Sequence, residues 1–202
     1  MRKLLIFLSA CMLPVLAISF RLGVKMPSKI YTTDKGEVSF FSKAPIEDID
    51  AHNRSMSAAL NTRDQEFECV VPVSKFEFRL GKMQRDFNNR FMDTEKYPIA
   101  TFTGKINEPV DFDKDGTYNV TVSGYMKIHG VSQNRTEKGT VTVKGNTVSI
   151  ASNFKIRVKD FKVKIPILLT RHIAETVDVK VKADLQLNEK MTNDLLGKNH
   201  SL

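Results

Sequence analysis

The sequence predicts an all-β protein, an antiparallel arrangement of eight or nine strands accompanied by one short helix. Long stretches of the chain alternate apolar and polar residues, which is the pattern of a strand that turns one face toward a core. Turn-forming residues separate these stretches at spacings that suit hairpins. The strand–helix–strand alternation that is typical of a parallel sheet is absent from the sequence. We therefore expect an antiparallel barrel or a tall sandwich.

The first residues, 1–19, have the features of a signal peptide. Arg2 and Lys3 form a short positive region, and Leu4–Ile18 is an apolar run that is too short and too soon broken by Pro14 to span a membrane comfortably. Small residues at positions 17 and 19 predict cleavage after Ser19 and a periplasmic or secreted protein.

A second kind of processing fits the same segment. Residues Leu8–Cys11 match a bacterial lipoprotein box, in which Cys11 would be lipidated and retained. We favour plain secretion, because Met12–Ile18 would leave an apolar stretch where a lipoprotein needs a polar tether.

Strands follow one another through the rest of the chain. The alternation predicts strands at Ile30–Thr33, Glu37–Ser42, Arg54–Leu60, Glu66–Val73, Ala100–Ile106, Thr117–Ile128, Thr136–Val143, Val148–Val158 and Glu175–Leu187. Turns are expected at Asp34–Gly36, Asp113–Gly116 and Lys144–Asn146, where Gly, Asp and Asn cluster. One domain over residues 20–187 accounts for all of these strands.

One segment has a helical period instead. In Gly81–Thr94, the apolar residues Met83, Phe87 and Phe91 recur every fourth position, which places them on one stripe of a short helix. A second, weak helical turn is expected at Ile46–His52, and the tail at 188–202 is polar and expected to be frayed.

The charge of the chain is moderately basic, with 31 Lys and Arg against 23 Asp and Glu. The most basic stretch, Lys155–Lys164, carries its charges at alternate positions of a strand, so it predicts a solvated face and no nucleic-acid partner. A modest attraction to anionic membrane surfaces remains open. The sequence does not determine the oligomeric state, and a homodimer is one of the states compatible with it.

Catalytic and metal-binding patterns are missing from the sequence. The four histidines, at positions 52, 129, 172 and 200, have no metal-ligand spacing, and no phosphate-binding or nucleophile motif occurs. Cys69 lies in a strand-like run, where a thiol usually behaves as a small buried hydrophobe. We therefore expect no enzyme, no metal and no cofactor, with an enzyme on the same scaffold as a minor alternative.

Phenylalanine is abundant, with 13 residues in the chain, most of them on or beside the predicted strands. A closed eight-stranded barrel has an interior that is either just filled by side chains or able to hold a small ligand. An aromatic interior without catalytic groups is typical of a carrier for a long apolar ligand. The residues expected to line the binding site are Phe67, Cys69, Phe76, Phe78, Phe102, Met126, Ile128, Phe154 and Ile156. Met83, Phe87 and Phe91 are expected to close one end of the barrel, and Arg85 to meet a polar head group.

Several ordered motifs between about residues 30 and 187 resemble the YceI-like family of secreted lipid-binding proteins. The most specific is Tyr97-Pro98 followed by Thr101-Phe102 and later by His129-Gly130-Val131. The other motifs are Lys35–Phe40, Val71–Phe76, Met83–Phe87, Phe91–Asp93 and Phe161–Pro166. The chain departs from the family pattern at Phe87-Asn88, where His-Leu is expected after Arg-Asp, and over Ala44–Asn53.

The resemblance implies an antiparallel, eight-stranded, extended lipocalin-like β-barrel with one short helix. It also implies a polyisoprenoid ligand such as an isoprenoid quinone or a polyprenyl phosphate, or another fatty amphiphile. A barrel with a fully packed interior, acting as a structural or stress-response partner without a lipid, is the alternative.

Overall fold

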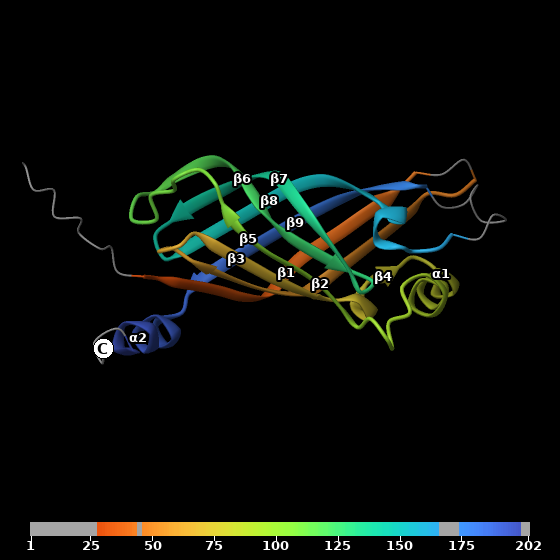
Figure 1. Ribbon diagram of the computed structural model, residues 1–202, viewed down its shortest axis with the longest axis horizontal. Coiled ribbons are helices and arrows are strands. Elements are labelled where there is room, and N and C mark those ends of the chain that lie inside the picture. Colours follow the sequence, from red (N-terminus) through yellow and green to blue (C-terminus); the bar gives the residue numbers. More distant parts are fainter. Residues whose placement is uncertain (1–27, 44–45, 166–173, 199–202) are drawn as a thin grey trace, which may run out of the picture.

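In the computed structural model, which describes residues 28–43, 46–165 and 174–198, the strands form one continuous sheet that coils into an elongated barrel (Figure 1). The strands are β1 (Ile30–Ser42), β2 (Ile49–Asn61), β3 (Glu66–Pro72), β4 (Glu77–Phe78), β5 (Ile99–Ile106), β6 (Gly116–Ile128), β7 (Val131–Lys144), β8 (Thr147–Arg157) and β9 (Thr176–Leu187). Helix α1 (Gly81–Asp86) continues into a π-helical segment, Phe87–Phe91, and helix α2 (Glu189–Lys198) follows β9. Short 3₁₀ turns lie at Val73–Lys75 and Val158–Phe161.

The barrel is closed by β1, which pairs with β9 on one side and with β2 on the other. The order around the barrel is β1-β9-β8-β7-β6-β5-β3-β2, and every pairing is antiparallel. The short β4 lies outside this ring and pairs with β2 at Ala51 and His52, beyond the end of the β2–β3 ladder. The predicted eight-stranded antiparallel barrel is therefore confirmed, with one extra strand.

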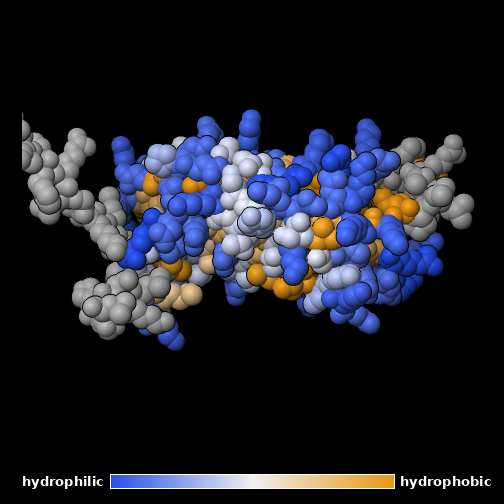
Figure 2. Space-filling model, in the orientation of Figure 1, coloured by the Kyte–Doolittle hydropathy of each residue, from blue (hydrophilic) through white to orange (hydrophobic). Residues whose placement is uncertain are grey.

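Alternation along each strand separates the interior from the surface. In β3, for example, Phe67, Cys69 and Val71 are buried, whereas Glu66 and Glu68 are exposed. Successive side chains of a strand point to opposite faces, so a single alternating strand supplies both the wall of the interior and the solvated exterior. The exterior is largely hydrophilic, with a few apolar patches between charged side chains (Figure 2).

The two ends of the barrel are filled differently. At the end that precedes α2, the side chains of Tyr31, Leu60, Ile106, Val148 and Leu185 are almost completely buried against one another. Burying a side chain of this size stabilises the folded state by about 1.5–3 kcal/mol. This end is a packed core, and α1 lies at the opposite end of the molecule from α2 (Figure 1).

Two predictions at the start of the barrel are wrong. The predicted turn at Asp34–Gly36 is instead part of one long strand, β1, whose register against β2 shifts between Thr33 and Gly36 and again before Val38. A Cβ at Gly36 would lie 2.4 Å from Cε of Met56, so glycine is what lets the irregular strand pass this side chain. The predicted helical turn at Ile46–His52 is also wrong, because β2 begins at Ile49.

The other predicted turns are confirmed as hairpin connections. Gly145, at φ 55°, lies in the two-residue turn between β7 and β8, and the turn at Asp113–Asp115 leads into β6, which begins at Gly116. His129 and Gly130 join β6 to β7 with positive φ values of 51° and 75°. Positive φ at both central residues matches the twist of the flanking strands.

The predicted helix is present but changes its winding. It starts at Gly81 as an α-helix and becomes π-helical from Phe87 to Phe91, where the amide of Met92 donates to the carbonyl oxygen of Phe87 over 2.9 Å. The tail was expected to be frayed, but it contains α2, whose Thr192 accepts a hydrogen bond from the amide of Ile30 over 3.0 Å. This contact ties the helix to the first strand.

Candidate functional site

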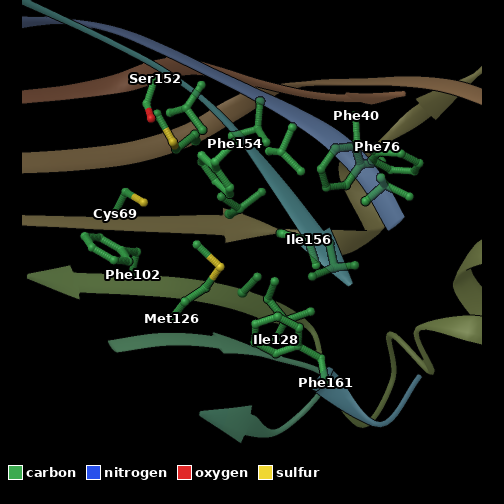
Figure 3. A pocket seen from close by; sticks show the side chains of 18 of the residues that line it. Phe40, Cys69, Phe76, Phe102, Met126, Ile128, Ser152, Phe154, Ile156 and Phe161 are labelled. Carbon is green, nitrogen blue, oxygen red and sulfur yellow. The ribbon is translucent and has the colours of Figure 1, made fainter. Parts of the chain in front are cut away.

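A cavity of about 530 Å³ occupies the barrel interior on the side of α1 (Figure 3). Each of the eight barrel strands contributes side chains to its wall. Phe102 on β5, Met126 and Ile128 on β6, and Phe154 and Ile156 on β8 point into it, as Figure 3 shows. The wall is apolar because these strands turn their apolar positions inward, while the packed end closes the bottom of the cavity.

Four phenylalanines gather where the cavity meets α1. Phe87 lies 4.8 Å from Phe78, 5.7 Å from Phe76 and 5.8 Å from Phe40, measured between ring centroids. These side chains come from the helix, from β4, from the segment before β4 and from β1. Aromatic rings at such separations attract one another beyond their area of contact, so the cluster holds the helix against the barrel.

The helix lines this end of the cavity with the stripe that its sequence predicts. Met83, Phe87 and Phe91 all contribute to the lining. Charged side chains accompany them at the rim, where Glu47, Lys82 and Asp86 also border the cavity.

Twelve of the thirteen predicted site residues line the cavity. They are Phe67, Cys69, Phe76, Phe78, Met83, Phe87, Phe91, Phe102, Met126, Ile128, Phe154 and Ile156. Their position agrees with the expected binding wall, and their contact with a ligand stays a prediction.

Arg85 is the exception, since it is exposed and is not among the lining residues. Met83 and Phe87 are four residues apart and share the inner face of the helix. A residue midway between them is turned by about 200° from each, because an α-helix has 3.6 residues per turn. Arg85 therefore lies outside the lining, and its contact with a head group stays a prediction.

Sequence reasoning missed several lining residues. Phe40 and Phe161 line the cavity, and so do two polar residues, Glu137 on β7 and Ser152 on β8. Glu137 is separated from the buried Val141 and Val143 by an even number of residues, so it faces the same side of β7. The alternation in β7 could therefore have identified it as an inward-facing charge.

The thiol of Cys69 is buried in the cavity wall. Burial raises its pKa from the ordinary 9.0 to about 11, although a backbone hydrogen bond with Phe102 acts in the opposite direction. At neutral pH the side chain is therefore an uncharged apolar group, as the sequence indicated.

The histidines do not form a reactive group within the described residues. His52 is exposed, with Nε2 3.0 Å from Oδ2 of Asp50, and His129 packs against the ring of Tyr97 in the β6–β7 turn. His172 and His200 lie outside the described residues. In residues 28–43, 46–165 and 174–198, no group of three or more His, Cys, Asp or Glu side chains could hold a metal ion. The helices that the structure describes include none with the length and apolar character needed to cross a membrane.

The barrel, its helix and the order of its motifs agree with a known family. The sequence pattern of the YceI-like domain matches residues 31–185. The chain belongs to the YceI-like family. No curated protein matches the chain at a significant level.

Solved structures of YceI-like and related proteins share the fold. A polyisoprenoid-binding domain from Saccharophagus degradans, implicated in plant cell wall breakdown, matches with a TM-score of 0.67 and 16% identity over 79% of this chain and 98% of its own. BcnA from Burkholderia cenocepacia matches with a TM-score of 0.61 and 21% identity over 75% of this chain and 96% of its own. The YCEI protein of Campylobacter jejuni matches with a TM-score of 0.57 and 16% identity over 71% of this chain and 86% of its own.

The buried thiol gives a direct test of the wall assignment. With Cys11 replaced by Ser, iodoacetamide should alkylate Cys69 in the folded protein at pH 8 about two orders of magnitude more slowly than in urea, because the raised pKa depletes the thiolate. The folded state keeps the thiol protonated, so the stability that this contributes is complete below pH 9.0 and is lost as the pH rises toward about 11. Equal alkylation rates in the two states would show that the thiol is not in the wall.

Proposed function

We propose that this protein is a carrier that holds a long-chain amphiphile, a polyisoprenoid such as an isoprenoid quinone or a polyprenyl phosphate, inside its barrel. The observation that carries the proposal is the apolar cavity of about 530 Å³ that opens beside α1. The similarity in fold to a domain described as polyisoprenoid-binding supports the choice of ligand class.

The energetics favour an extended apolar chain. Each methylene group transferred from water into an apolar site contributes about 0.8 kcal/mol. The cavity volume lies within the range of about 300–1,000 Å³ that is usual for ligand sites. An isoprenoid chain packed against Phe102, Phe154 and Ile156 can therefore bind through chain burial, before any polar contact is counted.

A binding role fits the cavity better than the two alternatives that the sequence left open. A fully packed barrel would have no such cavity, whereas only the end near α2 is packed here. For an enzyme, the wall offers a neutral thiol at Cys69 and mainly apolar side chains. We therefore assign binding, and no chemical step, to this site.

We further propose that the carrier acts in the periplasm or outside the cell, after cleavage behind Ser19. The basic n-region and apolar run at 1–19 support export, and these residues lie outside the described part of the structure. The intact mass of the exported protein should correspond to a chain that starts at Phe20. A lipid-modified chain that starts at Cys11 would instead establish the lipoprotein alternative.

Replacing a phenylalanine at the mouth tests the binding site. We expect Phe87→Asp to abolish retention of a polyisoprenoid, because the carboxylate would have to lose water at the centre of the aromatic cluster once the chain is bound. Tyr125→Asp is the matched control, since Tyr125 is 64% exposed on the outer face of β6 and should leave retention unchanged. Lipid that copurifies with each folded variant is measured after solvent extraction. A folded Phe87→Asp protein that keeps its lipid would show that the mouth is elsewhere.

A further inference from the structure

The cavity wall contains a split where β7 and β8 separate. Their ladder begins with the pair Lys144 and Thr147, next to the turn, and ends with the pair Gly139 and Ser152. Beyond this point, residues 153–157 of β8 pair only with β9, and residues 131–138 of β7 pair only with β6. The ring of strands is continuous near α2 and opens toward the half that holds the cavity.

Side chains bridge the split in place of the backbone ladder. The hydroxyl of Ser152 donates to the carbonyl oxygen of Lys138 over 2.6 Å. Farther along, Nη2 of Arg135 donates to the carbonyl oxygen of Lys155 over 2.8 Å. The side-chain amide of Gln133 donates to the backbone carbonyl oxygen of Asp160 over 2.9 Å. The wall is therefore polar along this line, within an otherwise apolar interior.

A charged pair lies on the inward-facing side of β7 at the split. Arg135 and Glu137 have the parity of the buried Val141 and Val143, and Nε of Arg135 donates to Oε1 of Glu137 over 2.7 Å. Their side chains are only 24% and 15% exposed. Arg135 faces Gly124 across the β6–β7 ladder, so no side chain from that position competes for the same space.

Two residues of the split that reach the cavity offer hydrogen-bond acceptors, whereas Lys138, which also borders the cavity, belongs to the exposed outer face of β7. Glu137 and Ser152 both line the cavity. Glu137 presents a carboxylate, and the hydroxyl proton of Ser152 is committed to Lys138, which leaves its oxygen lone pairs for a ligand. The polar head of an amphiphile inside an apolar cavity needs such partners, because burying a hydroxyl without a hydrogen bond is unfavourable.

We propose that Glu137 and Ser152 form the head-group subsite of the carrier and select an uncharged head that bears a hydroxyl group. Arg135 donates both to the carboxylate of Glu137, on the same strand, and across the split to the carbonyl oxygen of Lys155. The inference rests on the proposed function, since it assumes that the apolar chain occupies the cavity beside Phe154 and Ile156.

The charge of the subsite sets its preference. The guanidinium of Arg135 is already neutralised by Glu137, so it offers little attraction to a second anion. A phosphate head would place its negative oxygens against the carboxylate, and like charges brought together in an interface are unfavourable. A hydroxyl, in contrast, donates to the carboxylate in a charge-assisted hydrogen bond. A polyprenol and an isoprenoid quinol share this chemistry.

The test compares ligands that differ in the head group. Delipidated protein is offered a polyprenol, the corresponding polyprenyl phosphate, an isoprenoid quinol kept reduced, and squalene, which has no polar head. We expect the polyprenol to bind at least about tenfold more tightly than its phosphate. This is the difference in affinity that one hydrogen bond to a charged group provides. The affinity of the quinol relative to the polyprenol identifies which of the two hydroxyl sources fits better.

Glu137→Gln is the decisive variant, because it keeps an acceptor for Arg135 and removes the negative charge. It should weaken polyprenol binding, strengthen phosphate binding, and leave squalene binding unchanged. Glu68→Gln, which removes one carboxylate from the exposed outer face of β3, is the matched control and should leave the preference of the unmodified protein intact.

The possible failures are distinguishable. If squalene and polyprenol bind but Glu137→Gln changes neither the polyprenol nor the phosphate affinity, the subsite is wrong and the carrier proposal stands. A loss of preference in Glu68→Gln, or tighter binding of the phosphate by the unmodified protein, would also overturn the subsite. Binding of none of the four compounds would overturn the proposed function itself.

Discussion

The pairing of β1 with both β2 and β9 is the constraint on which the rest of the structure depends. It joins the two edges of the sheet into a ring, and this pairing satisfies backbone groups that β1 and β2 would expose as edge strands. The strand achieves this only by shifting register around Gly36, where Met56 passes close to the backbone. Once the ring is closed, every inward-facing side chain shares one interior, and the length of the strands determines how much of it side chains can fill.

The interior divides into a part that stabilises the fold and a part that remains open. Near α2, Tyr31, Leu60 and Leu185 are almost completely buried and belong to one hydrophobic cluster. Because this packed end supplies the burial that the fold needs, the other half can keep a cavity without collapsing. The aromatic cluster around Phe87 holds the helix over that half, beside the opening of the cavity. An apolar ligand would add contacts of the same kind to this cluster.

Local patterns in the sequence predicted most of the wall, and long-range pairing accounts for what they missed. Alternation alone places Phe67, Phe102 and Phe154 inside the barrel, because the period of a strand fixes the face of each side chain. The Asp34–Gly36 segment has turn chemistry, yet it is an irregular part of β1: Gly36 pairs with Met56 of β2, and pairing with β9 resumes at Glu37. The split between β7 and β8 could not be predicted, since it depends on where one strand leaves another.

If the open half of the barrel holds an amphiphilic chain, that chain can be identified directly in the purified protein. The full-length precursor would be expressed in a bacterium, purified from the periplasm without detergent, and extracted with organic solvent for mass spectrometry. We expect a prenyl or acyl species at close to one molecule per protein. A protein that is empty on purification, and still empty after incubation with isoprenoid quinone, polyprenol and polyprenyl phosphate, would contradict it.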